Sequence, residues 1–307
     1  MALTKVFLVY FYISMNTLNQ SIKAHFLYLS AIFVSILLMI VLKYSAIGNH
    51  LNVYQSIFYK TTIFSVLFTP FYIKYFKIIK LKDIYFFVFT VLCGIYDAYA
   101  MNFCWTKLPV NNIVILVFLS PFVMSSLAFI FLKEKIYLKT IIAMLICFLG
   151  VIISINWKMD NKNNLFWYGV LFSNLIISGI GWILLKKLTQ KGYSSSFISY
   201  IRILAISITS FFMIDSLPNM NYTNMTLIII MSCGYIYERI TFAKAYSMTD
   251  VSKLQPLKFT NIIFSSILGY IILGEKITKH QSISICIVAT AMGLLYVNFN
   301  KKISVNL

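Results

Sequence analysis

The feature that most constrains this chain is a succession of apolar runs, each about 20 residues long, separated by short polar connections. A run of this length is what a helix needs to cross the hydrocarbon core of a bilayer. Of the 307 residues, 60% are hydrophobic and only 11% are charged, whereas soluble domains carry about 25% charged residues. So much apolar surface cannot be buried inside a soluble particle of this size, and a helix satisfies its own backbone hydrogen bonds in lipid. The sequence therefore predicts an all-α, polytopic membrane helix bundle.

Windows of this length predict about ten spans, and the short connections leave no room for a separate soluble domain. The predicted spans cover residues 24–43, 53–73, 84–105, 110–132, 137–156, 165–186, 196–215, 225–246, 252–273 and 280–298. The apolar run at 6–13 is followed by Asn and Gln rather than by the small residues of a signal-peptide cleavage site. We therefore expect residues 1–23 to be a cytoplasmic N-terminal tail or an interfacial segment, and residues 300–307 to be a cytoplasmic C-terminal tail.

Basic residues in short loops predict the orientation, because cytoplasmic loops are enriched in Lys and Arg. Ten spans place sixteen basic residues on one face of the membrane and six on the other. The smaller group is Lys43, Lys107, Lys158, Lys162, Lys276 and Lys279. An even number of spans brings both termini to the basic face, so we expect a multi-pass protein of the cell inner (plasma) membrane with both termini cytoplasmic. The net charge of +18 is then explained by the basic residues in short loops that set the orientation in the membrane, and no nucleic-acid partner is expected.

The second half of the chain echoes the first at an offset of about 141 residues. The matched positions include charged residues: Asp97 with Glu238, Lys60 with Arg202 after a slip of one residue, and Glu134-Lys135-Ile136 with Glu275-Lys276-Ile277. Shared apolar composition explains matched Ile and Leu, but it explains matched acids and bases poorly. Because five spans per unit is an odd number, the two units must cross the membrane in opposite senses. The sequence predicts inverted repeats over 24–157 and 158–299, an arrangement that transporters use.

The segments around the two Glu-Lys turns resemble the drug/metabolite transporter superfamily, of the ten-helix EamA type. LPVNNIVILVFLSPFVMSSLAFIFLKEKI in the first unit resembles the family's fourth helix, and LQPLKFTNIIFSSILGYIILGEKI in the second resembles its ninth. The spacing from Pro256 to Glu275 is similar to that in a subgroup that includes S-adenosylmethionine uptake transporters. Lys133 replaces the Gly often found before the first Glu-Lys, whereas Gly274 keeps it in the second.

This resemblance covers nearly the whole chain after residue 23. It implies a secondary transporter that moves a small polar metabolite by alternating access, with S-adenosylmethionine or an amino-acid-like compound as candidates. Export of amino acids or drugs is the alternative. The partners implied are the lipid bilayer, a small-molecule substrate, and a proton or counter-substrate that drives transport. Whether the chain forms a homodimer stays open.

Charged residues inside the spans are candidates for substrate binding or coupling. Each costs at least about 2.5–3.5 kcal/mol near a helix centre unless it has a partner or a watery cavity. They are Lys60, Asp97, Arg202, Glu238 and Lys258. A central cavity lined by these residues would suit a substrate with both charge signs, and its two acids would be candidates for proton coupling. The alternative is that Lys60–Asp97 and Arg202–Glu238 are buried ion pairs that fix helix packing.

Aromatic residues and prolines near these charges are further candidates. Tyr96, Tyr99 and Tyr237 could hold a ring or an organic cation, although Tyr is common at the interfaces of any membrane protein. Pro121 and Pro256 interrupt the fourth and ninth spans and predict kinks. Such kinks serve a helix that lines a cavity, but membrane proteins also tolerate them without function.

Glu134 and Glu275 lie at helix ends beside lysines, where we expect them to shape a turn or to close a gate. No HExxH motif supports an intramembrane enzyme, and the three histidines lie apart near span ends. The five cysteines show no CxxC spacing, so no metal site and no cofactor are expected. A channel or a structural membrane protein, the other rival, would not need inverted repeats with matched charges.

Overall fold

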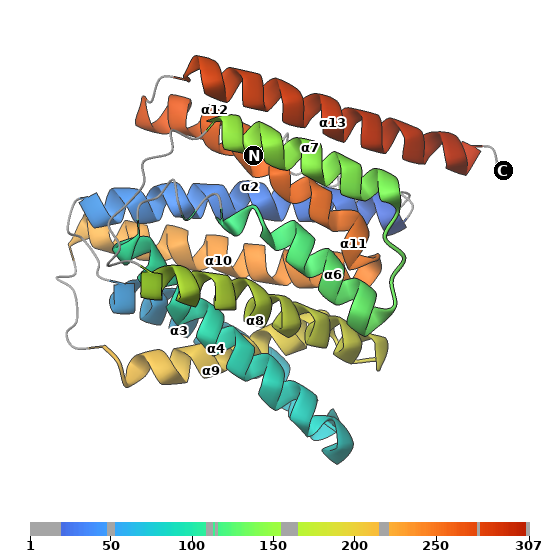
Figure 1. Cartoon of the computed structure of the whole chain (residues 1–307). Helices are drawn as coiled ribbons and strands as arrows, with labels where there is room; N and C mark the ends of the chain where they lie inside the picture. Colours follow the sequence, from blue (N-terminus) through green and yellow to red (C-terminus); the bar gives the residue numbers. More distant parts are fainter. Residues whose placement is uncertain are drawn as a thin grey trace, which may run out of the picture.

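The apolar runs fold as helices, without strands, throughout the part of the chain that the structure, a computed structural model, describes. That part comprises residues 20–47, 53–108, 113, 116–154, 165–214, 221–274 and 277–304. Figure 1 shows the helices running along one another as a single bundle. The predicted all-α membrane bundle of two inverted five-helix repeats is confirmed.

Most helices follow the predicted spans; the fourth, predicted at 110–132, has a turn at residues 118–119, so that α6 begins at Ser120. The first half contains α2 (Gln20–Ile47), α3 (Val53–Tyr72), α4 (Ile84–Lys107), α6 (Ser120–Leu132) and α7 (Leu138–Ser154), with two 3₁₀ turns, η1 (Ile73–Ile78) and η2 (Leu81–Asp83), between α3 and α4. The second half contains α8 (Leu165–Gln190), α9 (Ser195–Phe211), α10 (Tyr222–Met248) and α13 (Lys279–Ser304). Its ninth span is divided into α11 (Val251–Leu254), the 3₁₀ helix η4 (Gln255–Thr260) and α12 (Asn261–Leu273).

Within the part of the chain that the structure describes, four segments are long and apolar enough to cross a bilayer by length and composition alone. They are Gln20–Val41, Leu81–Cys104, Leu165–Gln190 and Tyr222–Met248. Helices α6 and α9 are also apolar but shorter. Many large apolar side chains on the outside of the bundle are exposed, which suits surfaces whose solvent is lipid.

The two ends of the chain are more helical than the sequence predicted. Helix α2 begins at Gln20, so residues 20–23, which the prediction assigns to the N-terminal tail, are helical and continuous with the first helix. Helix α13 continues to Ser304, so residues 300–304 are helical too. A helix of 28 residues is about 42 Å long, longer than the hydrocarbon core of about 30 Å. Residues 1–19 and 305–307 lie outside the described residues.

The offset of 141 residues reappears in the bounds of the helices. Helices α6 and α12 each have 13 residues and begin at Ser120 and Asn261, 141 positions apart. Each ends in a left-handed residue at the same offset, Lys133 with φ 56° and Gly274 with φ 67°. The repeat is therefore a property of the backbone as well as of the charged residues.

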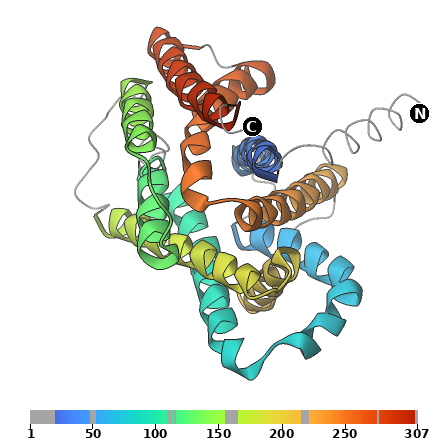
Figure 2. The same ribbon diagram turned by 90° about the vertical axis from the view of Figure 1, so that its right-hand side faces the viewer.

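Helices of one repeat pack mainly against helices of the other. Helix α2 packs along α10, and the equivalent pair, α8 and α4, packs in the same way. The remaining extensive pairs join equivalent helices, α7 with α13 on one side of the bundle and α3 with α9 on the other (Figure 1). Figure 2 shows α2 nearly end-on beside α10. The halves thus interlock, and their interface runs through the centre of the molecule.

Candidate functional site

A cavity of about 280 Å³ lies at the interface between the two repeats. Helices α2, α3, α4 and α6 of the first repeat and α8, α10, η4 and α12 of the second contribute to its lining. Its volume is close to the lower end of the range for small-molecule sites. Transporters built from inverted repeats hold their substrates at such an interface.

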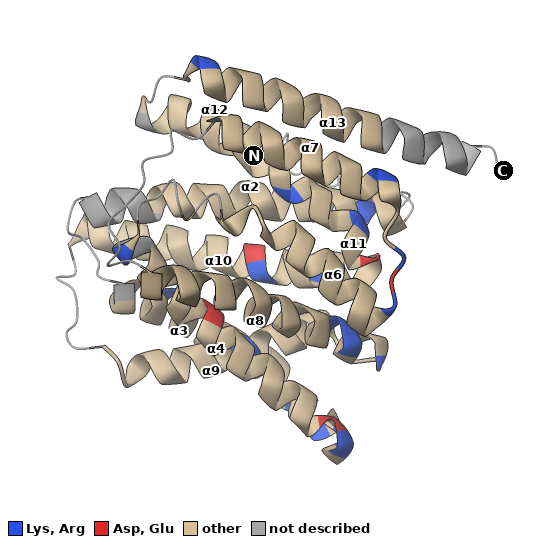
Figure 3. Cartoon of the chain, viewed as in Figure 1, with Lys and Arg blue, Asp and Glu red and all other residues tan. Residues whose placement is uncertain are grey.

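Five charged side chains line this cavity: Lys60, Asp97, Glu238, Arg239 and Lys258. Four of them were predicted from the sequence, and the cavity brings them together. Figure 3 shows that most charged positions lie at one end of the bundle, whereas few lie within the helices, among them adjacent acidic and basic positions midway along α10. The wall thus presents three basic and two acidic groups to one small volume.

Asp97 is paired with Arg239 and not with Lys60. The Arg239 Nη1 atom lies 3.6 Å from the Asp97 Oδ2 atom, which joins α10 to α4. The Asn174 side-chain amide donates a hydrogen bond of 3.3 Å to the other Asp97 oxygen from α8. The carboxylate of Asp97 is therefore already compensated by two neighbours, and its side chain is only 14% exposed.

Lys60 and Arg202 lie against aromatic rings. The Lys60 Nζ atom is 5.1 Å from the centroid of the Tyr235 ring, and the Arg202 guanidinium is 4.8 Å from the Trp182 ring. These distances suit cation–π contacts. Arg202 is buried and lines a smaller adjoining hollow together with Asp97 and Arg239, not the main cavity. The alternative pairing of Arg202 with Glu238 is not formed.

Glu238 and Lys258 differ from the other cavity charges. Within the described part of the chain, neither forms an ion pair, although both line the cavity. Both side chains are partly exposed to the cavity, where each interacts at longer range with the other charges of the wall, including one another. One unpaired acid and one unpaired base in the same cavity make it suitable for a ligand that carries both signs.

The aromatic wall of the cavity differs from the one the sequence predicted. Tyr28, Trp182, Phe242 and Tyr246 line the cavity together with Tyr235. The rings of Trp182 and Tyr246 are 5.1 Å apart, and the hydroxyls of Tyr28 and Tyr246 are hydrogen-bonded at 3.2 Å.

The three predicted tyrosines lie elsewhere. The hydroxyl of Tyr96 is bonded to Ser173 at 2.7 Å, and Tyr99 donates to Thr209 at 3.4 Å. Tyr237 is largely exposed and donates to Ser30. None of the three lines the cavity. Tyr96 and Tyr237 precede their acid by one residue and therefore project about 100° to the side away from the cavity-lining Ala98 and Arg239, whereas Tyr99 projects about 160° from Asp97.

Sequence reasoning missed the contribution of α8. Asn174, Ser178 and Trp182 recur every four residues and all line the cavity. Residues at this spacing share one helix face. A polar stripe on an otherwise apolar span was the signal that could have identified them. Arg239, the partner of Asp97, was not among the predicted site residues, although it lies next to Glu238 in the sequence.

Both prolines lie where a helix is interrupted. Pro121 occupies the first turn of α6, where its missing N–H needs no partner. Pro256 lies in η4, the 3₁₀ segment between α11 and α12. The ring of Phe118, just before α6, stacks on the ring of Phe259 in η4, with centroids 5.7 Å apart and planes at 12°. The two breaks therefore meet in the middle of the bundle.

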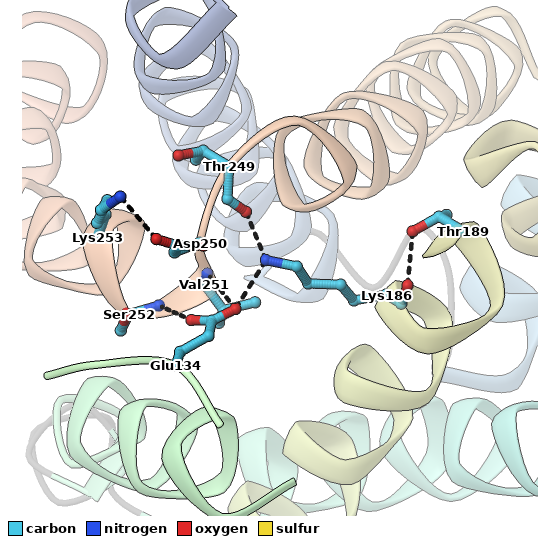
Figure 4. Close-up of polar contacts among 8 residues, drawn as sticks. All are labelled: Glu134, Lys186, Thr189, Thr249, Asp250, Val251, Ser252 and Lys253. Atoms are coloured by element: carbon cyan, nitrogen blue, oxygen red, sulfur yellow. Dashed lines mark hydrogen bonds and ion pairs between the residues drawn. The ribbon is translucent and has the colours of Figure 1, made fainter. Parts of the chain in front are cut away.

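Glu134 joins three helices at the end of α6 (Figure 4). Its buried carboxylate accepts a hydrogen bond of 2.7 Å from Lys186 of α8. It also accepts from the backbone N–H groups of Val251 and Ser252 at 3.1 and 3.0 Å, at the start of α11. Lys186 donates further to the Thr249 carbonyl at 2.6 Å. Glu275, the equivalent acid in the second repeat, lies outside the described residues.

Comparison with known proteins gives two relatives and a related fold. The chain is 25% identical over 251 residues to the S-adenosylmethionine uptake transporter of Rickettsia bellii (strain RML369-C), which covers 78% of this chain and 83% of that protein. It is 21% identical over 258 residues to the S-adenosylmethionine uptake transporter of Rickettsia conorii (strain ATCC VR-613 / Malish 7), with coverages of 81% and 85%.

One solved crystal structure superposes with a TM-score of 0.76 over 92% of this chain and 98% of that chain. Its sequence identity is 9%, so this likeness concerns the fold alone.

One protein family matches this chain in two separate segments. Residues 22–156 and residues 165–297 each match the same family, which agrees with the repeat seen in the charges and in the helix bounds. This chain belongs to the EamA-like transporter family.

Proposed function

We propose that this protein is a secondary transporter that takes up S-adenosylmethionine, or an amino-acid-like compound with the same zwitterionic head group, by alternating access. The observation that carries the proposal is the cavity at the repeat interface, where Glu238 and Lys258 are unpaired charges of opposite sign. A zwitterion supplies a counter-charge to each of them. A substrate with one charge, or with none, would supply a direct partner to at most one of them.

The aromatic wall supports the larger of these candidates. S-adenosylmethionine has an adenine ring and a sulfonium group besides its amino-acid head. Trp182 and Phe242 are partly exposed and contribute aromatic surface to the cavity wall, which favours contact with an adenine ring and with an organic cation. The names of the two relatives point to the same substrate.

Coupling and orientation form part of the same proposal. Glu238 is the proton-coupling candidate, because the carboxylate of Asp97 is already compensated by Arg239 and Asn174. We place both termini in the cytoplasm, on the face rich in Lys and Arg. Glu134 and Lys186 then lie towards the cytoplasmic face, where the contacts that they make connect α6, α8 and α11 and could close a gate at this end of the bundle.

The test is uptake of labelled S-adenosylmethionine into proteoliposomes that contain the purified full-length protein. We expect saturable uptake that excess unlabelled substrate inhibits. The Glu238→Gln variant should lose most of this uptake and its dependence on a pH gradient. Lys253→Gln is the matched control, because Lys253 lies in α11 and is paired with Asp250 at 2.6 Å, away from the cavity.

Two results would count against this proposal. Wild-type rates in a correctly inserted Glu238→Gln variant would remove Glu238 from the site. Absence of S-adenosylmethionine uptake, together with transport of an uncharged compound, would remove the zwitterionic substrate class.

A further inference from the structure

The place where the two helix breaks meet has the features of a binding site for one end of the substrate. Phe118 and Phe259 are 141 positions apart and stack on each other, so the segments before α6 and before α12 lie against one another on the axis that relates the repeats. The first residue of each following helix, Ser120 and Asn261, is also related by this offset. Both line the cavity.

These two residues present polar atoms that have no partner. The hydroxyl oxygen of Ser120 and the Oδ1 atom of Asn261 are buried and form no hydrogen bond within the described residues. Ser120 is only 4% exposed. A buried polar atom without a partner is unfavourable, and most such atoms in native proteins are satisfied by water or a ligand. The two atoms thus indicate a place for polar groups of a bound molecule.

Lys258 adds a positive charge to the same place. It lies three residues before Asn261, across the junction of η4 and α12, and residues three apart project to the same side of a 3₁₀ turn. Both side chains line the cavity. Whereas Lys60 lies over Tyr235 and Arg239 is paired with Asp97, Lys258 has neither an ion pair nor a ring contact within the described part of the chain.

We infer that this junction binds the amino-acid head group of the substrate, with the carboxylate held by Lys258 and the Ser120 hydroxyl. The inference rests on the proposed function and adds the orientation of the substrate in the cavity. Lys258 and Ser120 donate to the carboxylate oxygens. The Asn261 side-chain oxygen accepts from the neighbouring ammonium group, which lies next to the carboxylate in every α-amino acid. The carboxylate thereby becomes a requirement for tight binding.

The experiment compares ligands that differ only in this carboxylate. Binding of S-adenosylmethionine and of decarboxylated S-adenosylmethionine to the purified full-length protein is measured by calorimetry. We expect the wild type to prefer the carboxylated ligand by about tenfold or more, the size of a charge-assisted hydrogen bond. In Lys258→Gln this preference should fall to within about twofold, through loss of affinity for the carboxylated ligand alone. Ser120→Ala should reduce the preference in the same direction, by a smaller factor.

The decarboxylated ligand also reports on folding, because a correctly folded Lys258→Gln protein still binds it. Lys253→Gln and Ser125→Ala are matched controls: Ser125 is buried in α6 but does not line the cavity. Equal affinity of the wild type for both ligands would overturn the inference, as would a Lys258→Gln variant that loses both equally.

The same comparison with methionine and 3-(methylthio)propylamine separates this inference from the proposed function. If the wild type binds none of the four ligands, the proposed substrate class fails and the inference fails with it. If it binds them without preferring the carboxylate, the inference alone fails.

Discussion

Lys133 is the residue whose backbone conformation is least suited to its side chain. It follows α6 with φ 56°, the left-handed region, and within the described residues it is the one non-glycine with a positive φ. Its counterpart in the second repeat, Gly274, adopts φ 67° without a Cβ atom. A side chain in this region costs roughly 1 kcal/mol or more, and glycine is the usual residue there.

We therefore expect Lys133→Gly to stabilise the protein. The gain should be about 0.5–1 kcal/mol, because the added freedom of glycine in the unfolded chain offsets part of the relief. The measurement is the thermal unfolding midpoint of the detergent-solubilised protein. Gly274→Ala, which introduces a Cβ atom at the equivalent position, should lower the midpoint. A lower midpoint for Lys133→Gly would contradict the argument from the left-handed conformation.

The charges of the cavity show what the sequence can predict about individual residues. Their rarity within apolar spans identified Lys60, Asp97, Glu238 and Lys258, and the cavity contains all four. Their partners could not be predicted in this way. The pairing of Asp97 with Arg239 depends on how α4 and α10 are positioned by α3, α8 and α9, which pack against both, and this arrangement has no local sequence pattern.

At the scale of the helices, the contacts of Glu134 connect α6, α8 and α11. Its carboxylate and the Lys186 ammonium are only 6% and 7% exposed. Removal of one member of a buried pair is destabilising by about 3–5 kcal/mol, because the other charge is left without compensation. We expect Glu134→Gln to cost less than Glu134→Ala, since the amide oxygen can still accept from the backbone N–H groups of α11.

A double-mutant cycle measures this connection. Glu134→Ala and Lys186→Met are each expected to lower the free energy of unfolding, and the double variant should lose less than the sum of the two. The coupling should be about 0.5–3 kcal/mol, the range for residues in contact. Additive losses would mean that the two side chains stabilise the protein independently, contrary to the contacts in Figure 4.

Helix α8 approaches α4 closely because of a glycine. A Cβ atom at Gly181 would lie 2.8 Å from the Cβ atom of Cys93 in α4, which is fixed to the backbone. Gly181→Ala should therefore push the two helices apart and cost about 1–3 kcal/mol, as other overpacked cores do. Gly169→Ala is the matched control on the same helix, since a Cβ atom there meets nothing within 4 Å. An unfolding midpoint that falls equally in both variants would contradict a specific role for the close approach.

The helices themselves were largely predictable, because hydrophobic length is a local property that the bilayer imposes. The interruption of the ninth span could be predicted only in part. Pro256 predicted an interruption, but a proline does not specify a 3₁₀ segment of six residues that places Lys258 and Asn261 on one side. That conformation depends on its packing against α6, α7 and α2. The polar stripe on α8 was predictable in principle from its spacing of four residues.

At the scale of the whole molecule, the two halves cannot act as independent domains. Helix α2 packs along α10, α4 along α8, and α7 along α13, so each extensive contact joins one repeat to the other. The candidate cavity lies between the same helices. Exposure of the cavity to the opposite face therefore requires these contacts between repeats to rearrange together. The rearrangement is expected to be slow compared with diffusion through an open pore.

This coupling leads to a prediction that separates a carrier from a channel. We expect proteoliposomes preloaded with unlabelled S-adenosylmethionine to take up the labelled compound several times faster at first than empty proteoliposomes, with a transient overshoot. A loaded cavity should return to the outer face more readily than an empty one, because the bound zwitterion compensates Glu238 and Lys258 during the movement. The rate should saturate with substrate concentration. Equal initial rates in preloaded and empty vesicles, rising linearly with concentration, would instead indicate a pore that both faces reach at once.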